Sequence, residues 1–196
     1  MLVWLSRAPQ PEAAGDASVV DRWYADENPF VVCRQRAGSA LLSLGFCLAS
    51  PGQRPRRIAA HTRPDQIVRV ALPPSLVEVS ELQPDTFAHL SDAAADAGLD
   101  LRVFGSWMWQ TLAGGSHVNA SSDLDLLIDV ADAAGADRAA DFLKREASEC
   151  PFKLDGELSL SGLGEIHWRE YLGGGASILV KSVKTVRMVR REELWK

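Results

Sequence analysis

The sequence predicts an α+β protein of two parts: a small β-rich domain over residues 1–83 and a domain with α/β elements over residues 84–196. Three observations predict it. The early apolar runs are short and rich in β-branched and aromatic residues. Later apolar residues recur at helical spacing and alternate with strand-like runs. The Pro73-Pro74 pair interrupts the chain between these two patterns.

The first domain is expected to contain at least three strands. Pro29–Gln35 and Ala40–Ala49 are apolar runs separated by residues 36–39, so they are expected to form a hairpin. Ser50–Arg57 (SPGQRPRR) is rich in turn-forming residues and predicts a loop. Ile67–Leu72 alternates in polarity and predicts another short strand.

The second domain is expected to begin with a helix that Asp85 caps and that runs to Ala97, with Gly98 just beyond its end. A buried strand follows, and then the start of a second helix. The remaining elements alternate in type along the chain. In order, the predicted elements after the first helix are strand Leu101–Phe104, helix start Trp107–Leu112, strand Leu124–Val130, helix Ala136–Glu149, and strands Pro151–Leu160 and Ser177–Val183.

Charge distribution excludes several functional classes. The formal net charge is −5, and residues 85–150 carry 12 acidic against 4 basic side chains. Because no segment has a large basic excess, a nucleic-acid-binding surface is not expected. No apolar stretch approaches the roughly 20 residues that span a bilayer, and the start of the chain lacks a secretory pattern. We therefore expect a cytoplasmic protein whose clustered carboxylates suit a metal ion and a phosphorylated ligand.

The stretch SSDLDLL, residues 121–127, places two carboxylates inside an apolar run. Residues two apart in a strand point to the same face, so Asp123 and Asp125 project together while Leu124 and Leu126 enter the core. Two adjacent carboxylates repel each other and require a compensating positive charge. Mg²⁺ suits all-oxygen ligands and phosphorylated substrates, so the pattern predicts a magnesium site.

A Gly-Ser pair precedes these carboxylates. Gly105 would let the backbone approach a ligand closely, and Ser106 with the amides of a helix N-terminus would offer donors to phosphate oxygens. A Gly-Ser pair alone is usually a turn, and an Asp-x-Asp alone is usually a solvated strand edge. Their occurrence in the order strand, Gly-Ser, helix and Asp-x-Asp favours a site for phosphoryl or nucleotidyl transfer.

This order resembles the Pol β-like nucleotidyltransferase superfamily, whose third carboxylate lies on a later strand. The resemblance implies a Pol β-like catalytic domain and two-metal catalysis with Mg²⁺. The third carboxylate is then expected within FKLDGELSL, residues 152–160. Asp155 is the first choice and Glu157 the alternative, since both lie on one face of a regular strand. Gly156 between them could form a bulge that changes this choice.

Longer matches resemble one family within that superfamily. RVFGSWMWQTLAGG, SDLDLLIDV, KLDGELSLSGLGEIHWREYL and ILVKSVKTVRMV are similar to the malonate decarboxylase holo-acyl-carrier-protein synthases, the MdcG family of phosphoribosyl-dephospho-CoA transferases. The resemblance implies attack by a serine of an apo acyl-carrier protein on 2'-(5''-triphosphoribosyl)-3'-dephospho-CoA, with release of pyrophosphate. The carrier would be the malonate decarboxylase subunit, although a citrate lyase type of carrier stays open.

The resemblance also implies roles for individual residues. The nucleophile belongs to the carrier, so Ser106 would bind phosphate. Asp123 and Asp125 would bind both metal ions, and Asp155 would help to activate the incoming hydroxyl. Lys181, in ILVKS, matches a lysine of the family's last motif and could neutralise the triphosphate, but a solvated strand-end lysine is the alternative.

Other candidates are weaker. The arginines in the Pro-rich loop are expected to be solvated, and the histidines show no ligand spacing and are expected to be surface or core residues. These are Arg54, Arg56 and Arg57, and His61, His89, His117 and His167. Two other functions stay open: a nucleotidyltransferase that uses an ordinary NTP on a small molecule, protein or RNA, and a catalytically silent binding module. The presence of all three carboxylates disfavours the silent module.

Overall fold

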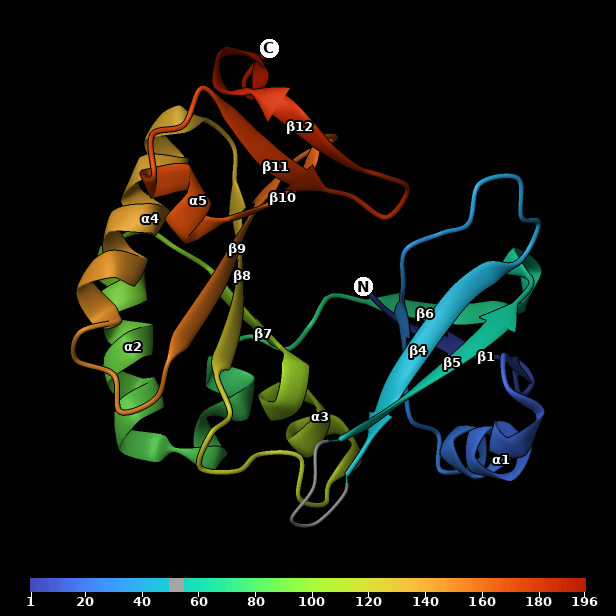
Figure 1. Cartoon of the computed structure of the whole chain (residues 1–196). Coiled ribbons are helices and arrows are strands. Elements are labelled where there is room, and N and C mark those ends of the chain that lie inside the picture. Colours follow the sequence, from blue (N-terminus) through green and yellow to red (C-terminus); the bar gives the residue numbers. More distant parts are fainter. Residues whose placement is uncertain (50–54) are drawn as a thin grey trace. The chain divides into compact units, whose positions relative to one another are not determined.

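The computed structural model describes residues 1–49 and 55–196 and divides the chain into two compact units (Figure 1). The first comprises Met1–Pro73 with Leu112–His117, and the second comprises Pro74–Thr111 with Val118–Lys196. In the described residues each unit contains a six-stranded sheet, and helices accompany both sheets, so the predicted mixture of helices and strands is confirmed. Every helix in these residues is too short or too polar to traverse a bilayer.

The first unit is an antiparallel sheet with strand order β2-β5-β4-β3-β1-β6. Its core forms where α1 packs on β4: Trp23 stacks on Phe46 with ring centroids 4.3 Å apart, and Phe30 meets Phe46 edge-on. The elements are β1 (Leu2–Leu5), β2 (Gln10–Pro11), η1 (Ala14–Asp16), α1 (Ala17–Ala25), β3 (Phe30–Val32), β4 (Leu42–Leu48), β5 (Arg56–Thr62), η2 (Pro64–Gln66) and β6 (Ile67–Ala71).

The hairpin and the later strand predicted for this unit are confirmed. β3 pairs with β4, with Val31 opposite Gly45, and β6 covers most of Ile67–Leu72. The predicted Ser50–Arg57 loop is wrong at its end, because Arg56 and Arg57 begin β5 and pair with β4. Pairing with a neighbouring strand supplies backbone hydrogen bonds that the local turn-forming composition does not reveal. Arg54 and the rest of residues 50–54 lie outside the described residues.

The second unit is a sheet with order β12-β11-β10-β9-β8-β7, in which β8 and β9 run parallel and the other neighbours antiparallel. Its elements are η3 (Val77–Leu82), α2 (Pro84–Asp96), β7 (Leu101–Phe104), α3 (Gly105–Ala113), β8 (Leu124–Val130), α4 (Ala133–Glu146), β9 (Leu154–Leu160), β10 (Gly164–His167), α5 (Trp168–Leu172), β11 (Ser177–Lys181), β12 (Val186–Arg190) and η4 (Arg191–Glu193).

Helices α2 and α4 lie on the same face of this sheet (Figure 1). Strands β8 and β9 turn alternate residues to that face, where Leu124, Leu126 and Leu158 are fully buried. They pack with Phe87 of α2 and Phe142 of α4 in one core. The intervening residues of the same strands point to the opposite face, which carries polar side chains. The alternation predicted for Asp123 to Leu126 therefore describes this sheet correctly.

Residues 74–83 belong to the second unit, although the sequence pattern assigned them to the first. Val103 N donates to Pro74 O (2.8 Å), and Leu76 N donates to Leu101 O (2.9 Å). Leu76 and Val79 are also buried in the second core. These pairings were not visible in the sequence, because they join segments more than 20 residues apart.

Helix starts differ from the sequence-based expectations by a few residues. Gln83 is the N-cap of α2 and Pro84 takes its first position, so Asp85 lies within the first turn. Helix α4 begins earlier than residue 136, because the Asp132 carboxylate accepts a hydrogen bond from Gly135 N (2.7 Å) and caps it. Helix α3 begins at Gly105.

Candidate active site

Asp125 and Asp155 are direct neighbours across the parallel pair β8–β9. Adjacent strands lie about 4.8 Å apart, so this register places the two carboxylates side by side on the face opposite helices α2 and α4. The flanking pairs, Leu124 with Leu154 and Leu126 with Gly156, turn to the buried face. The buried apolar residues therefore fix the register that brings the two aspartates together.

The register passes through Gly156 without a shift, so the bulge considered for this position does not form. A Cβ on Gly156 would lie 2.6 Å from Leu143 Cδ1 and 3.2 Å from Trp168 Cδ1. Glycine is present because α4 packs too closely for a side chain. Asp155 and Glu157 consequently share a face, as expected for a regular strand. Asp155 is the direct register partner of Asp125, whereas Glu157 lies two residues further along β9, opposite Leu127.

Lys153 supplies positive charge to the aspartates. Its Nζ lies 2.5 Å from Asp123 Oδ2 and 4.0 Å from Asp155 Oδ2, so one ammonium group contacts both carboxylates. The hydrogen bond to Asp123 raises the pKa of Lys153 above its usual value, and the lysine stays charged. Sequence reasoning missed Lys153, although its spacing of two from Asp155 placed both on one strand face.

Gly105 places the start of α3 directly against Asp125. Strand β7 ends at Phe104, which pairs with Asp125, and Gly105 follows with a positive φ of 67°. A Cβ at Gly105 would overlap Asp125 Oδ2 and lie 2.9 Å from its Cγ. Ser106 is the half-buried second residue of the helix. The Gly-Ser pair and the second aspartate of the Asp-x-Asp motif therefore meet in space.

Trp107 connects α3 to the first aspartate. Its indole Nε1 donates to the backbone carbonyl of Asp123 (3.0 Å), and its ring, only 3% exposed, packs against both Phe87 and Phe152. The indole is thus a core residue whose polar group finds a backbone partner. This contact fixes the backbone that carries the Asp123 carboxylate.

Lys181 lies on the same sheet face but is paired with Glu157. Lys181 Nζ is 2.6 Å from Glu157 Oε1. The other oxygen of Glu157 is buried and has no hydrogen-bond partner among the described residues. Burial, together with repulsion from Glu157, raises the pKa of Glu165, which is the register neighbour of Lys181. Lys181 therefore balances the negative charge of Glu157 and lies beside Glu165, further along the face than the aspartates.

His167 extends this polar face onto β10. Its Nε2 lies 2.6 Å from Asp155 Oδ1, and its Nδ1 accepts a hydrogen bond from Arg169 N. The sequence analysis expected His167 to be a surface or core residue, and the structure adds this contact with Asp155. The sequence did not reveal this contact because it depends on the antiparallel register of β9 and β10, in which His167 faces Glu157.

Carboxylate oxygens such as those of Asp123, Asp125 and Asp155 are the ligand type that Mg²⁺ prefers, and the Lys153 ammonium marks a place between Asp123 and Asp155 where positive charge is favoured. Asp123 and Asp155 side chains are 36% and 32% exposed, so both are accessible to an ion from solution. The residues present thus suit the expected metal.

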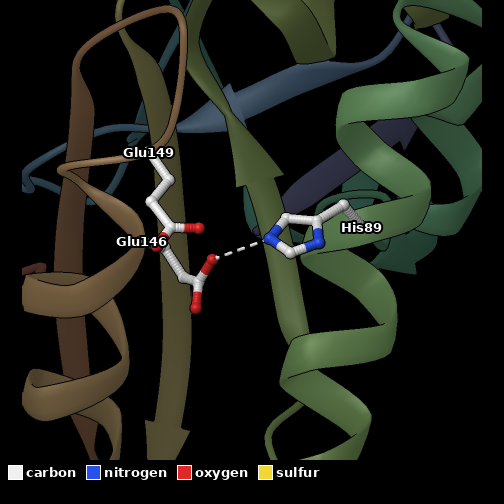
Figure 2. A group of neighbouring side chains, drawn as sticks. All are labelled: His89, Glu146 and Glu149. Carbon is white, nitrogen blue, oxygen red and sulfur yellow. Dashed lines mark hydrogen bonds and ion pairs between the residues drawn. The ribbon is translucent and has the colours of Figure 1, made fainter.

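A group of side chains of the types that can bind a metal lies elsewhere in the unit (Figure 2). His89 of α2, Glu146 at the end of α4 and Glu149 three residues beyond it have ligand atoms within 4.8 Å of one another. The Glu146 carboxylate is buried, and its oxygens meet His89 Nε2 (3.2 Å) and Arg145 Nε (2.9 Å). Protein donors already satisfy the buried Glu146 carboxylate, which links α4 to α2 through the exposed side chain of His89.

Two family models match this chain. The phosphoribosyl-dephospho-CoA transferase MdcG N-terminal domain matches residues 1–73, and the corresponding C-terminal domain matches residues 75–192. The second match contains all the polar residues described above. No solved structure matches the chain.

Curated relatives carry the name phosphoribosyl-dephospho-CoA transferase. One from Xanthomonas axonopodis pv. citri is 34% identical over 99% of this chain and 94% of its own length. One from Bradyrhizobium diazoefficiens is 34% identical over 90% and 80%, and one from Klebsiella pneumoniae is 28% identical over 92% and 89%. The family models and these relatives together cover both units, and the chain therefore belongs to the MdcG family of phosphoribosyl-dephospho-CoA transferases.

Proposed function

We propose that this protein transfers the phosphoribosyl-dephospho-CoA group from 2'-(5''-triphosphoribosyl)-3'-dephospho-CoA to a serine of an apo acyl-carrier protein. The observation that carries the proposal is the pairing of Asp125 with Asp155 beside the start of α3. Membership of the transferase family supports the choice of substrate. The strand, Gly-Ser, helix and Asp-x-Asp order further supports placing the second unit among the Pol β-like nucleotidyltransferases.

In the proposed reaction the serine oxygen of the carrier attacks the phosphorus nearest the ribose. A phosphorus–oxygen bond to serine forms, the bond to pyrophosphate breaks, and the serine proton leaves the hydroxyl. Asp155 accepts that proton or orients the hydroxyl that loses it. No covalent intermediate on this protein is needed, because the carrier supplies the nucleophile.

Asp123, Asp125 and Asp155 would hold Mg²⁺, which when bound neutralises charge on the phosphates and makes the hydroxyl more acidic. Gly105 and Ser106 at the start of α3 would contribute backbone and hydroxyl donors to phosphate oxygens. Lys153 and Lys181 lie on the same face, and each can exchange its carboxylate partner for a phosphate. The chain's own residues thus position the triphosphate and receive the proton.

We further propose which carrier accepts the group and in which compartment the protein acts. The acceptor is the acyl-carrier subunit of malonate decarboxylase, which the resemblance of the sequence motifs to the malonate decarboxylase synthases supports. A cytoplasmic location is supported by the thiols of Cys33 and Cys150, which a reducing compartment preserves.

Mass spectrometry of the carrier tests the proposed function. The protein is incubated with Mg²⁺ and apo carrier of the malonate decarboxylase or citrate lyase type, with either the triphosphoribosyl precursor or ATP. The expected result is a mass gain equal to the prosthetic group on the malonate decarboxylase carrier, only with the precursor. Transfer from ATP, or transfer only to the citrate lyase carrier, would contradict the proposed substrate or partner.

A further inference from the structure

His167 has both ring nitrogens engaged. It is the N-cap of α5, and its Nδ1 accepts a hydrogen bond from Arg169 N (3.2 Å). A neutral imidazole whose Nδ1 is an acceptor carries its proton on Nε2. His167 Nε2 therefore donates to Asp155 Oδ1, 2.6 Å away. The backbone of α5 selects the tautomer that binds the carboxylate.

The two oxygens of Asp155 consequently have different surroundings. Oδ1 accepts from His167 Nε2 and from Gly156 N (3.1 Å). Oδ2 is turned toward the Lys153 ammonium, which also binds Asp123. Two protein donors hold one oxygen, and the other faces the position where positive charge is favoured.

We infer that His167 is a positioning residue, which fixes Asp155 so that Oδ2 faces the metal and the incoming hydroxyl. The inference rests on the proposed function for its catalytic meaning. Partners of this kind orient carboxylate and histidine ligands in metal sites, and their removal typically lowers metal affinity or activity about 10- to 100-fold. Here the donor comes from β10, the strand next to the one that carries Asp155.

Capping alone does not account for histidine at this position. Asn, Ser, Thr and Asp are the common N-cap residues, and a shorter side chain would bind Arg169 N as well. Histidine binds Arg169 N with one nitrogen and reaches Asp155 with the other. The two contacts can therefore be separated by substitution.

His167→Asn keeps an oxygen that caps α5 but is too short to reach Asp155. His167→Gln has an amide nitrogen that extends about as far as Nε2 and preserves the donor to Asp155. His61→Asn, on β5 of the first unit, is the matched control for loss of a histidine. Each variant is compared with the wild-type chain by thermal unfolding, so that folding is measured separately.

Binding of Mn²⁺ in the absence of substrate is the decisive readout, followed as loss of the free-ion electron paramagnetic resonance signal. We expect about 10- to 100-fold weaker Mn²⁺ binding for H167N, with near wild-type binding for H167Q and H61N. In the transfer assay kcat should fall for H167N while KM for the carrier stays unchanged.

Wild-type Mn²⁺ affinity in a folded H167N variant would overturn the inference. So would an H167Q variant that is folded but binds Mn²⁺ as weakly as H167N. If the wild-type protein does not use the triphosphoribosyl precursor, the proposed function fails, but the Mn²⁺ comparison still decides whether His167 positions Asp155.

Discussion

Gly105 and Asp125 occupy adjoining space: a Cβ on Gly105 would overlap Asp125 Oδ2. A side chain on the first residue of α3 would occupy the position of the Asp125 carboxylate, so glycine is required there. Gly105 also has a positive φ of 67°, which other residues adopt at a cost. One glycine thus links the proposed phosphate-binding turn to the proposed metal ligand.

Gly105→Ala should displace Asp125 and reduce prosthetic-group transfer by about 100-fold, because shifts of about 1 Å at a reacting centre can cost that much. Gly98→Ala is the matched control, since Gly98 has a similar φ of 66° but open space around it. Gly98→Ala should lose about 1 kcal/mol of unfolding free energy, and Gly105→Ala should lose more because its methyl group also overlaps Asp125. Equal transfer activity of the two variants would show that steric contact with Asp125 does not matter.

Lys181→Met should lower the free energy of unfolding by about 1–3 kcal/mol, because it leaves the partly buried Glu157 carboxylate without its cation. Adding Glu157→Gln should restore most of that stability, as measured by urea denaturation. If Lys181 also binds the triphosphate, KM for the precursor stays about 10-fold raised in the double variant. A wild-type KM would instead assign Lys181 only to Glu157.

Gly156→Ala should destabilise the second unit by about 1–3 kcal/mol, because the added methyl group would lie 2.6 Å from Leu143 Cδ1. Combining it with Leu143→Ala should cost less than the sum of the two single changes, since the smaller residue makes room. Calorimetric or urea unfolding measures all four proteins. Strict additivity would argue against the close packing of α4 on β9.

Stability should also depend on pH through His117. Burial lowers the pKa of His117 below its usual 6.5, and its Nδ1 has no hydrogen-bond partner among the described residues. The unfolded chain therefore binds a proton more readily, and stability is lost as pH falls below 6.5 toward the folded-state pKa. The contribution of His117 to this slope is at most about 1.4 kcal/mol per pH unit, the value for one proton, and the slope should diminish in His117→Gln. His61→Gln is the control. If the dependence of unfolding free energy on pH is unchanged in His117→Gln, it does not come from His117.

Local patterns were sufficient for part of the fold and site. The period of two placed Asp123 and Asp125 opposite the buried leucines, and Leu101–Phe104 forms the predicted strand. The Gly156 position was ambiguous, because a strand glycine indicates either a bulge or close packing. Only the position of Leu143 on α4 distinguishes the two.

Contacts that depend on strand register could not be predicted from the sequence. His167 reaches Asp155 because β10 returns antiparallel beside β9, and Lys181 reaches Glu157 from the following strand. Both contacts join residues 12 or more positions apart. Short strands such as β10 carry too few residues for their alternation to be recognised.

The most direct test of the account compares wild-type protein with Asp125→Asn in the carrier mass assay, with Mg²⁺ and the triphosphoribosyl precursor. Asp123, Asp125 and Asp155 are proposed to hold the metal, so the wild-type protein should convert the apo carrier fully. Asp125→Asn and Asp123→Asn should transfer at least about 100-fold more slowly while keeping wild-type thermal stability. Near-normal transfer by either folded variant would contradict the central claim that these aspartates form the transfer site.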